Sequence, residues 1–523
     1  MRLIAAGIFC GLLAATASWA DEPKSASVPL TISQGALAGA QEDGIQVFKD
    51  IPFAAPPVGP LRWRAPQAGP AWQGARAADQ FGPICPQPKP SLLQRVIMPS
   101  LPQSEDCLSL NVWTPDAHAK LPVMVWIYGG AFVTGGSANP LYNGTDLAKH
   151  GVVVVSFNYR LGWLGFFNHP ALAADAPNEP HGNYGLMDQI AALEWVKANI
   201  ASFGGDPANV TIFGESAGGM SVNDLMASPK AHGLFAKAIS ESGLGLTSMA
   251  TAQVASDAAK AFGGRNDAPG DGAVGLSKLR GLSVDDILAD QEKLPSVQIV
   301  SPMVDGQILP EEPGVAFAQG KMAHVPYIAG SNSNEATLMT ALHMSPADML
   351  KPLGDGAAMV RKIYEADGPL TDDDFGRQLF DDALFSSGAQ GLSDFVAKGG
   401  NPSYVYRFGY VAEALRPTTT GVGHGGEIAF VFGLRGLPDV IASKATSNDL
   451  AIVAQMQAYW TNFAKTGDPN GAGLPQWPTT SAATPRTLVV NDKATKSIDG
   501  FRKNQIAIMY VNWTKRTGQT PPN

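Results

Sequence analysis

The feature that most constrains this chain is a serine between two glycines, at the expected junction of a strand and a helix. Gly214, Ser216 and Gly218 form the pattern Gly-x-Ser-x-Gly, after an apolar run at 210–213 and before a helix-like run at 217–225. The apolar run is β-branched or aromatic, which predicts a buried strand. A turn with no loop requires glycine on both sides, because larger side chains would collide with the neighbouring backbone. We therefore expect the serine oxygen to stand out at the top of a sheet; a glycine-rich start of a helix is the alternative interpretation.

A second apolar run, at 123–128, leads into a glycine-rich turn. The run shows no alternation of polar and apolar residues, which is typical of a strand buried on both faces. Gly129, Gly130, Ala131 and Phe132 follow it directly. Such a turn either reverses the chain or aims backbone N–H groups at one point, as an oxyanion hole requires. The turn is therefore a candidate site for stabilising a developing negative charge.

The segments around these two runs follow the order strand, helix, strand. Residues 151–158 form a further buried-strand pattern, and residues 183–203 place apolar side chains at helical spacing before Gly204 and Gly205. This order predicts an α/β fold with a central, mostly parallel, twisted sheet flanked by helices. No linker, repeat or long charge run interrupts residues 21–523, so we expect them to form one large domain.

Two further stretches match sequence blocks of a known family. One runs from Phe48 to Gly59 and continues with Leu61-Arg62-Trp63; the other runs from Glu105 to Val112. With the serine pattern and the glycine-rich turn, these blocks stand in the order found in type-B carboxylesterases, and the chain resembles that family from about residue 30 to residue 515. The resemblance is nearest in kind to exported bacterial carboxylesterases of the para-nitrobenzyl esterase type. It implies the α/β-hydrolase fold, with additional helical insertions over the active site.

A serine hydroxyl is a poor nucleophile at neutral pH, so the chain must also supply a base and a carboxylate that orients the base. In the α/β-hydrolase fold the acid and then the histidine follow the serine along the chain. Four of the eight histidines lie after Ser216: His232, His324, His343 and His424. His424 is the one inside a glycine-rich loop, at 421–426, and with Glu427 and Ile428 it resembles the family's His-Gly-x-Glu-Ile block. We therefore expect His424 to be the base, although a lone histidine is often structural.

The acid is expected at the start of a helix that follows a strand at 325–329. Glu335 stands five residues after Gly330 and resembles the family's Gly-x-Asn-x-x-Glu acid, with Asn332 at the asparagine. Alternatively, Glu335 is a first-turn glutamate that the helix dipole favours. Asp305 is the reserve candidate for the acid.

The resemblance also implies roles for residues around the serine. The backbone N–H groups of Gly130, Ala131 and Ala217 would form the oxyanion hole. Glu215 would be a carboxylate behind the catalytic groups, and Ser242 a hydroxyl beside the acid. The implied reaction is the hydrolysis of a small-molecule carboxylic ester through an acyl-enzyme, and it requires no metal and no cofactor.

Three alternative functions remain open. A non-catalytic interaction protein on the same fold is one, but here the three triad positions are filled. A choline esterase would carry a cation-binding tryptophan in its first disulfide loop, whereas residues 85–107 contain no tryptophan or tyrosine. A specialised exported esterase for a polycarboxylate or toxin ester, resembling the fumonisin esterases, would be favoured by clustered arginine or lysine in the pocket.

The start of the chain and its cysteines indicate export. Residues 1–20 combine an arginine, a short apolar stretch and a small-x-small site at Ser18 to Ala20, which predicts a signal peptide cleaved near Ala20. We therefore expect a periplasmic or secreted protein with no stable membrane anchor. In an oxidising compartment Cys85 and Cys107 are expected to form a disulfide, with two free thiols as the alternative. The net charge of −9 argues against nucleic acid as a partner, and we expect a monomer or a weak homo-oligomer.

Overall fold

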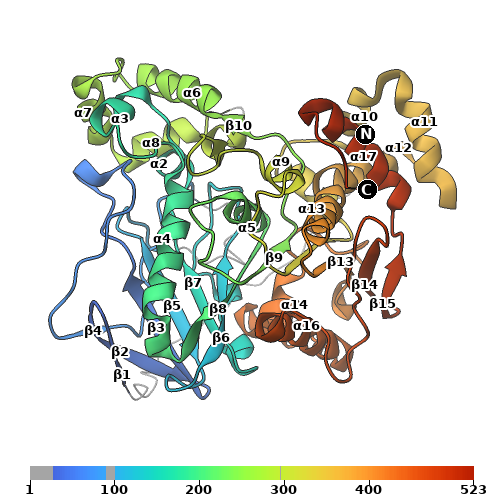
Figure 1. The fold of residues 1–523 in the computed structure, drawn as a ribbon, viewed down its shortest axis with the longest axis horizontal. Coiled ribbons are helices and arrows are strands. Elements are labelled where there is room, and N and C mark those ends of the chain that lie inside the picture. Colours follow the sequence, from blue (N-terminus) through green and yellow to red (C-terminus); the bar gives the residue numbers. More distant parts are fainter. Residues whose placement is uncertain (1–26, 90–100, 295, 523) are drawn as a thin grey trace, which may run out of the picture.

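The computed structural model describes residues 27–89, 101–294 and 296–522. The predicted signal peptide lies outside the described residues. A large sheet runs through the molecule with helices packed around it (Figure 1), and within the described ranges it has thirteen strands. These strands are β1 (Val28–Ile32), β2 (Gly35–Glu42), β3 (Ile45–Pro52), β4 (Ala75–Ala77), β5 (Ser109–Thr114), β6 (Leu121–Ile127), β7 (Val153–Phe157), β8 (Gly205–Glu215), β9 (Lys237–Glu241), β12 (Tyr327–Asn332), β13 (Ser403–Gly409), β14 (Arg486–Asn491) and β15 (Thr495–Asp499).

The centre of this sheet is parallel and its edges are antiparallel. Strands β7, β6, β8, β9, β12, β13 and β14 lie side by side in that order, and each pairs in parallel with its neighbour. Antiparallel pairs join β1, β2, β3, β5 and β7 on one side, and β14 and β15 on the other. The predicted α/β architecture, with a mostly parallel central sheet, is therefore confirmed.

Seventeen α-helices occur in the described residues. They are α1 (Thr145–Ala148), α2 (Gly162–Gly165), α3 (Pro170–Asp175), α4 (Tyr184–Asn199), α5 (Ala217–Ala227), α6 (Ala252–Arg265), α7 (Ala273–Gly281), α8 (Val284–Gln291), α9 (Pro313–Ala318), α10 (Pro346–Leu350), α11 (Ala357–Tyr364), α12 (Asp372–Asp381), α13 (Ser387–Lys398), α14 (Ile428–Phe432), α15 (Asp439–Ala442), α16 (Ser447–Thr466) and α17 (Lys503–Thr517). Two groups, α6–α8 and α10–α12, lie towards the top of Figure 1. Both groups belong to the long insertions between β9 and β13.

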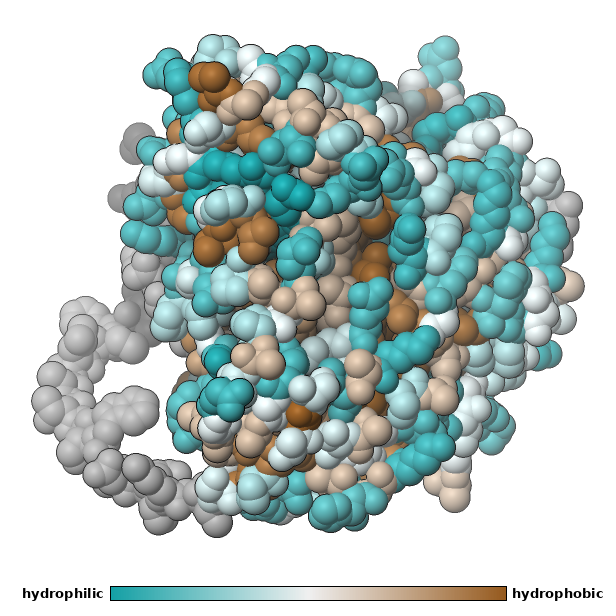
Figure 2. All heavy atoms as spheres, turned by 60° about the vertical axis from the view of Figure 1, so that its left-hand side comes forward, coloured by the Kyte–Doolittle hydropathy of each residue, from teal (hydrophilic) through white to brown (hydrophobic). Residues whose placement is uncertain are grey.

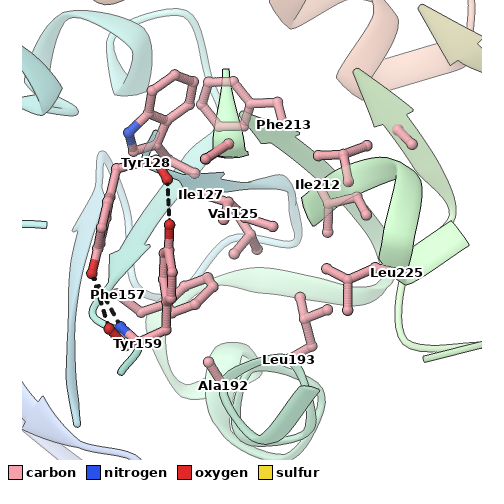
Figure 3. Close-up of a cluster of buried hydrophobic side chains, with 14 of the residues drawn as sticks. Val125, Ile127, Tyr128, Phe157, Tyr159, Ala192, Leu193, Ile212, Phe213 and Leu225 are labelled. Atoms are coloured by element: carbon pink, nitrogen blue, oxygen red, sulfur yellow. Dashed lines mark hydrogen bonds between the residues drawn. The ribbon is translucent and has the colours of Figure 1, made fainter. Parts of the chain in front are cut away.

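The two central strands are buried on both faces, as their uninterrupted apolar runs predict. On one face, Val125 of β6 and Ile212 of β8 point towards Leu193 of α4 and Leu225 of α5 (Figure 3). On the other face, the ring of Trp126 packs against Phe213 of β8 and Phe432 of α14, at centroid distances of 4.9 Å in both cases. Successive residues of a strand point to opposite faces, so the same two strands anchor both helical layers.

The disulfide expected from the cysteines is present. Cys85 and Cys107 are joined and both are buried, and the closed loop spans 22 residues of sequence. Figure 2 shows polar and apolar side chains interspersed over the face that it presents. Among the described residues, no helix has the length and apolar character needed to cross a membrane.

Candidate active site

Ser216 occupies a sharp turn between the end of β8 and the start of α5. Its backbone is at φ 58° and ψ −121°, a conformation that a residue with a side chain adopts only under strain. A Cβ atom added to Gly214 would lie 2.5 Å from the carbonyl oxygen of Ile127, and one added to Gly218 would lie 1.9 Å from the same oxygen. The crowded turn expected from the Gly-x-Ser-x-Gly pattern is therefore confirmed, and it leaves Ser216 partly accessible.

A continuous chain of hydrogen bonds links the serine to a histidine and a glutamate. Ser216 Oγ lies 2.7 Å from His424 Nε2, and His424 Nδ1 lies 2.6 Å from Glu335 Oε2. The backbone N–H of His424 donates to the hydroxyl of Thr337, 2.9 Å away, which fixes the loop that carries the imidazole. The structure therefore brings together the three residues that the sequence selected as nucleophile, base and acid, although 208 and 89 positions separate them in the chain.

Glu335 is fully buried, yet its contacts favour the ionised carboxylate. Its Oε1 atom accepts hydrogen bonds from the hydroxyl of Ser242 and from the backbone N–H of Asn332, both at 2.6 Å. Burial alone would raise its pKa, but His424 and these two donors outweigh burial, so the pKa of Glu335 lies below its usual range. The residue begins a helix, as expected, and the helix is of the 3₁₀ type, Glu335–Thr340.

The reserve candidate Asp305 makes a different set of contacts. One of its carboxylate oxygens accepts the backbone N–H groups of three following residues, 307–309, each at 2.9 Å. The other oxygen accepts a hydrogen bond from the side chain of Asn183, also at 2.9 Å. Asp305 therefore organises its own turn, and among the described residues its carboxylate does not hydrogen-bond to His424.

Two further buried glutamates, Glu215 and Glu427, act on the histidine, and a third, Glu241, lies beside Glu215. Oε1 of Glu215 lies 3.3 Å from His424 Nε2. Burial raises the pKa of Glu215 to about 7, against the opposing effect of His424. Burial and the neighbouring carboxylates raise the pKa of Glu427 to about 8, and burial also raises that of Glu241, which accepts a hydrogen bond from the indole of Trp460 at 2.8 Å. Burial disfavours the charged form of His424, but Glu215 and Glu335 together raise its pKa to about 10.

The glycine-rich turn after β6 lies against the serine. A Cβ atom added to Gly129 would be 3.0 Å from Cβ of Ser216. Gly130 and Ala131 both have positive φ, 116° and 54°, and the carbonyl of Gly130 accepts the N–H groups of residues 133 and 134. Over the described ranges, no hydrogen bond uses the N–H groups of Gly130, Ala131 or Ala217, so all three are available to an oxyanion.

Apolar side chains pack around His424. The ring of Phe385 lies 5.4 Å from the imidazole of His424, and it belongs to a π-helical turn, Asp382–Ser386, between α12 and α13. Phe385 is part of a separate apolar cluster whose buried members also include Ala336, Met339 and Phe380. Single π-helical turns are frequent at functional sites. Nothing in the sequence marks Phe385 or Glu241 as neighbours of the site. The one sequence signal for Glu427 is its place in the His424 block, four residues after Gly423.

Comparison with known proteins identifies the family of this chain. The family model described as "Carboxylesterase family" matches residues 26–509. The chain belongs to the carboxylesterase family. The para-nitrobenzyl esterase of Bacillus subtilis (strain 168) is 38% identical over 493 residues, which cover 89% of this chain and 95% of that protein. The fumonisin B1 esterase of Sphingopyxis macrogoltabida is 36% identical over 483 residues, which cover 88% of this chain and 86% of that protein.

Solved structures agree with the sequence comparison. A para-nitrobenzyl (PNB) esterase structure matches this carboxylesterase with a TM-score of 0.80 and 34% identity, over 92% of this chain and 99% of that one. The carboxylesterase therefore has the α/β-hydrolase fold, and it is a serine hydrolase of ester bonds that acts on a small-molecule ester. The family resemblance found in the sequence blocks is confirmed.

Proposed function

We propose that this carboxylesterase uses Ser216 as its nucleophile, His424 as its general base and acid, and Glu335 as the carboxylate that orients the histidine. The observation that carries the proposal is the unbroken hydrogen-bond chain from Ser216 Oγ through both ring nitrogens of His424 to Glu335. Each member alone is common in proteins. A strained serine, an imidazole and a buried carboxylate in this order are the parts that acyl transfer requires.

The first half-reaction forms an acyl-enzyme. As Ser216 Oγ bonds to the ester carbonyl carbon, His424 Nε2 takes the hydroxyl proton, and the carbonyl oxygen becomes an oxyanion. The N–H groups of Gly130, Ala131 and Ala217 bind that oxyanion, and each donor is worth about 10²- to 10³-fold in turnover. His424 then gives its proton to the alcohol oxygen as the carbon–oxygen bond breaks.

The second half-reaction releases the acid. His424 takes a proton from a water molecule, whose oxygen attacks the acyl carbon, and the same N–H groups hold the second oxyanion. Collapse of this intermediate breaks the bond to Ser216, and the proton returns from His424 to Oγ. Glu335 stays ionised throughout, because its three donors hold its pKa low, and it stabilises the imidazolium that forms twice in each cycle.

The substrate class follows from the side chains beside the histidine. Phe385 is buried, but partly buried apolar residues such as Leu244, Leu338 and Met344 pack against its cluster, and their remaining surface offers burial for a hydrocarbon group and not ion pairing. Two arginines approach this region in the described structure. Arg377 donates to the side chain of Asn334 at 3.2 Å, and the buried Arg407 is paired with Asp381 at 3.0 Å. One arginine is thus already neutralised, which leaves less than the cluster that a polycarboxylate requires. We therefore favour esters with an apolar acyl or alcohol group over the class suggested by the name of the fumonisin B1 esterase relative.

A panel of aryl esters tests this proposal. Acyl chains of increasing length, with a tricarboxylate ester beside them, should give an optimum among the uncharged chains. The Ser216→Ala variant should lose most of its activity on every ester. Its remaining rate should exceed the uncatalysed rate by no more than about 10³- to 10⁴-fold. Unchanged hydrolysis by that variant would overturn the serine assignment, and preference for the tricarboxylate would overturn the substrate class.

We also propose that the protein is exported and works as a single large domain, as a monomer or weak homo-oligomer. The disulfide between Cys85 and Cys107 supports an oxidising compartment. Amino-terminal sequencing of the protein recovered outside the cytoplasm tests the cleavage near Ala20. A start at Met1 would contradict it.

A further inference from the structure

The turn that carries two of the oxyanion donors is held at its end by a residue outside the triad. The side chain of Gln87 makes a reciprocal pair of hydrogen bonds with Gly135: the N–H of Gly135 donates to Gln87 Oε1 at 2.8 Å, and Gln87 Nε2 donates to the carbonyl of Gly135 at 2.6 Å. The same nitrogen donates to the carbonyl of Cys85 at 3.0 Å. Gln87 is only 5% exposed, so water cannot easily take the place of these bonds. Losing them would leave buried polar groups unpaired, at a cost in free energy.

A tyrosine holds the start of the same turn. The hydroxyl of Tyr159 donates to the carbonyl oxygen of Tyr128 at 2.9 Å, and the two rings stack with centroids 4.5 Å apart. Figure 3 shows the pair, with its hydrogen bonds, beside the central strands. Both rings are fully buried. The turn at 129–134 is therefore fixed on either side by a buried side chain from another segment.

The turn needs such support because its own conformation is unfavourable. Ala131 and Phe132 are at φ 54° and 61°, in the left-handed region that residues with a Cβ atom avoid. Residues in this region persist only where the surrounding structure determines them, at a free-energy cost of about 1–3 kcal/mol each. The N–H vectors of Gly130 and Ala131 depend directly on these angles.

We propose that Gln87 is a positioning residue for the oxyanion hole, and that the Cys85–Cys107 disulfide acts on catalysis through it. This inference rests on the proposed function. The disulfide fixes the chain two residues before Gln87, and the backbone N–H of Gln87 is held by Gln103 of the same disulfide loop at 3.0 Å. Gln87 thus connects a covalently closed loop to the turn whose N–H groups must meet the developing charge. Because an oxyanion forms only after attack, the support acts on the transition state and not on substrate binding.

The test is the variant Gln87→Met, which keeps the side-chain length but loses all three hydrogen bonds. We expect kcat per active site, counted by endpoint titration with a fluorophosphonate, to fall about 10- to 100-fold while KM stays within about twofold. Affinity for a trifluoromethyl ketone, whose adduct places an oxyanion in the hole, should fall by a similar factor. A role in stability alone would lower the unfolding temperature without moving either quantity.

The matched control is Gln390→Met. Gln390 is equally buried, at 5% exposure, and its two hydrogen bonds go to Asp394 and Thr480. This variant should lose stability but keep kcat per active site. If Gln87→Met keeps wild-type kcat and ketone affinity, or if Gln390→Met loses them equally, the positioning role is wrong.

A second variant covers the case in which Gln87→Met does not fold. Tyr159→Phe keeps the stacked ring and removes only the hydrogen bond to the carbonyl of Tyr128, and it should shift kcat and ketone affinity in the same direction. Replacing both cysteines by serine should lower kcat in the wild-type background but not further in a Gln87→Met background. Additive losses would remove the disulfide from the proposal. Activity that survives in Ser216→Ala would instead defeat the proposed function, whatever Gln87 does.

Discussion

Oε1 of Glu215 lies 3.3 Å from Nε2 of His424, the same ring nitrogen that faces the hydroxyl of Ser216. Glu215 precedes Ser216 in sequence, so the strained turn places both residues at once. His424, the proposed base, is therefore flanked by two carboxylates, one on each ring nitrogen. Their charges raise its pKa, whereas a general base must be neutral when the serine attacks.

Removing the charge of Glu215 should move the pH profile. Since the Glu215 carboxylate raises the pKa of His424, the variant Glu215→Gln lowers it, and the acidic limb of kcat/KM should move to lower pH. The measurement is the apparent pKa of kcat/KM against pH, which belongs to the coupled group and not to one residue. Glu194→Gln is the control, because it removes the same charge from an exposed place on α4. A shift to higher pH would contradict the account.

The acid can be tested against its reserve candidate. Glu335→Gln leaves the shape of the site but removes the charge that stabilises the imidazolium, so kcat should fall by about 10³- to 10⁴-fold. Asp305→Asn should keep kcat per active site within about twofold, because its contacts are confined to its own turn and Asn183. Turnover numbers with one aryl ester decide between them, and the reverse pattern would exchange their roles.

Ala131 should limit the alcohol that the site accepts. Its methyl group stands in the turn that meets the oxyanion, whereas its N–H is the part that the mechanism uses. Ala131→Gly should therefore keep activity on esters of primary alcohols. It should raise the relative kcat/KM for esters of branched alcohols, by about tenfold for each 1.4 kcal/mol of steric free energy removed from the transition state. Ala131→Val should do the opposite. Equal selectivity in all three proteins would show that the methyl group is not in the alcohol's path.

The disulfide should also contribute to stability. A closed loop spanning 22 residues stabilises the folded state by about 3 kcal/mol in the chain-entropy description. Replacing Cys85 and Cys107 together by serine should lower the free energy of unfolding by about that amount in denaturant titrations. Thiol titration of the unfolded, unreduced protein from residue 21 onwards provides the check on the wild type. Two reactive thiols would show that the bridge does not form.

The sequence could predict the features that depend on local pattern. The serine turn, the apolar strands at β6 and β8 and the helix α4 all follow from residue type and spacing, and the structure contains each of them. His424 could be selected because glycines surround it and because the chain order of the triad is fixed within the fold. The sequence also predicts that a helix starts near Glu335, but it does not indicate that this helix is of the 3₁₀ type.

The buried glutamates around His424 depend on strand pairing, which the sequence does not display. Glu215 and Glu241 are direct partners in the parallel register of β8 and β9, so they lie side by side although 26 positions separate them. Glu427 is held by the side-chain amide of Asn332, whose backbone N–H donates to Glu335. Gln87 likewise bonds to Gly135 across 48 positions of sequence. Such contacts arise from tertiary packing and leave no periodic signal.

The most direct measurement of the central claim is covalent labelling of the nucleophile. A fluorophosphonate should bond to one oxygen per molecule, and peptide mass spectrometry should locate it on Ser216. The rate of labelling should fall by several orders of magnitude in His424→Ala, because the hydroxyl then lacks its base. Labelling at another residue with Ser216 unmodified, or equal labelling rates with and without the imidazole, would contradict the triad.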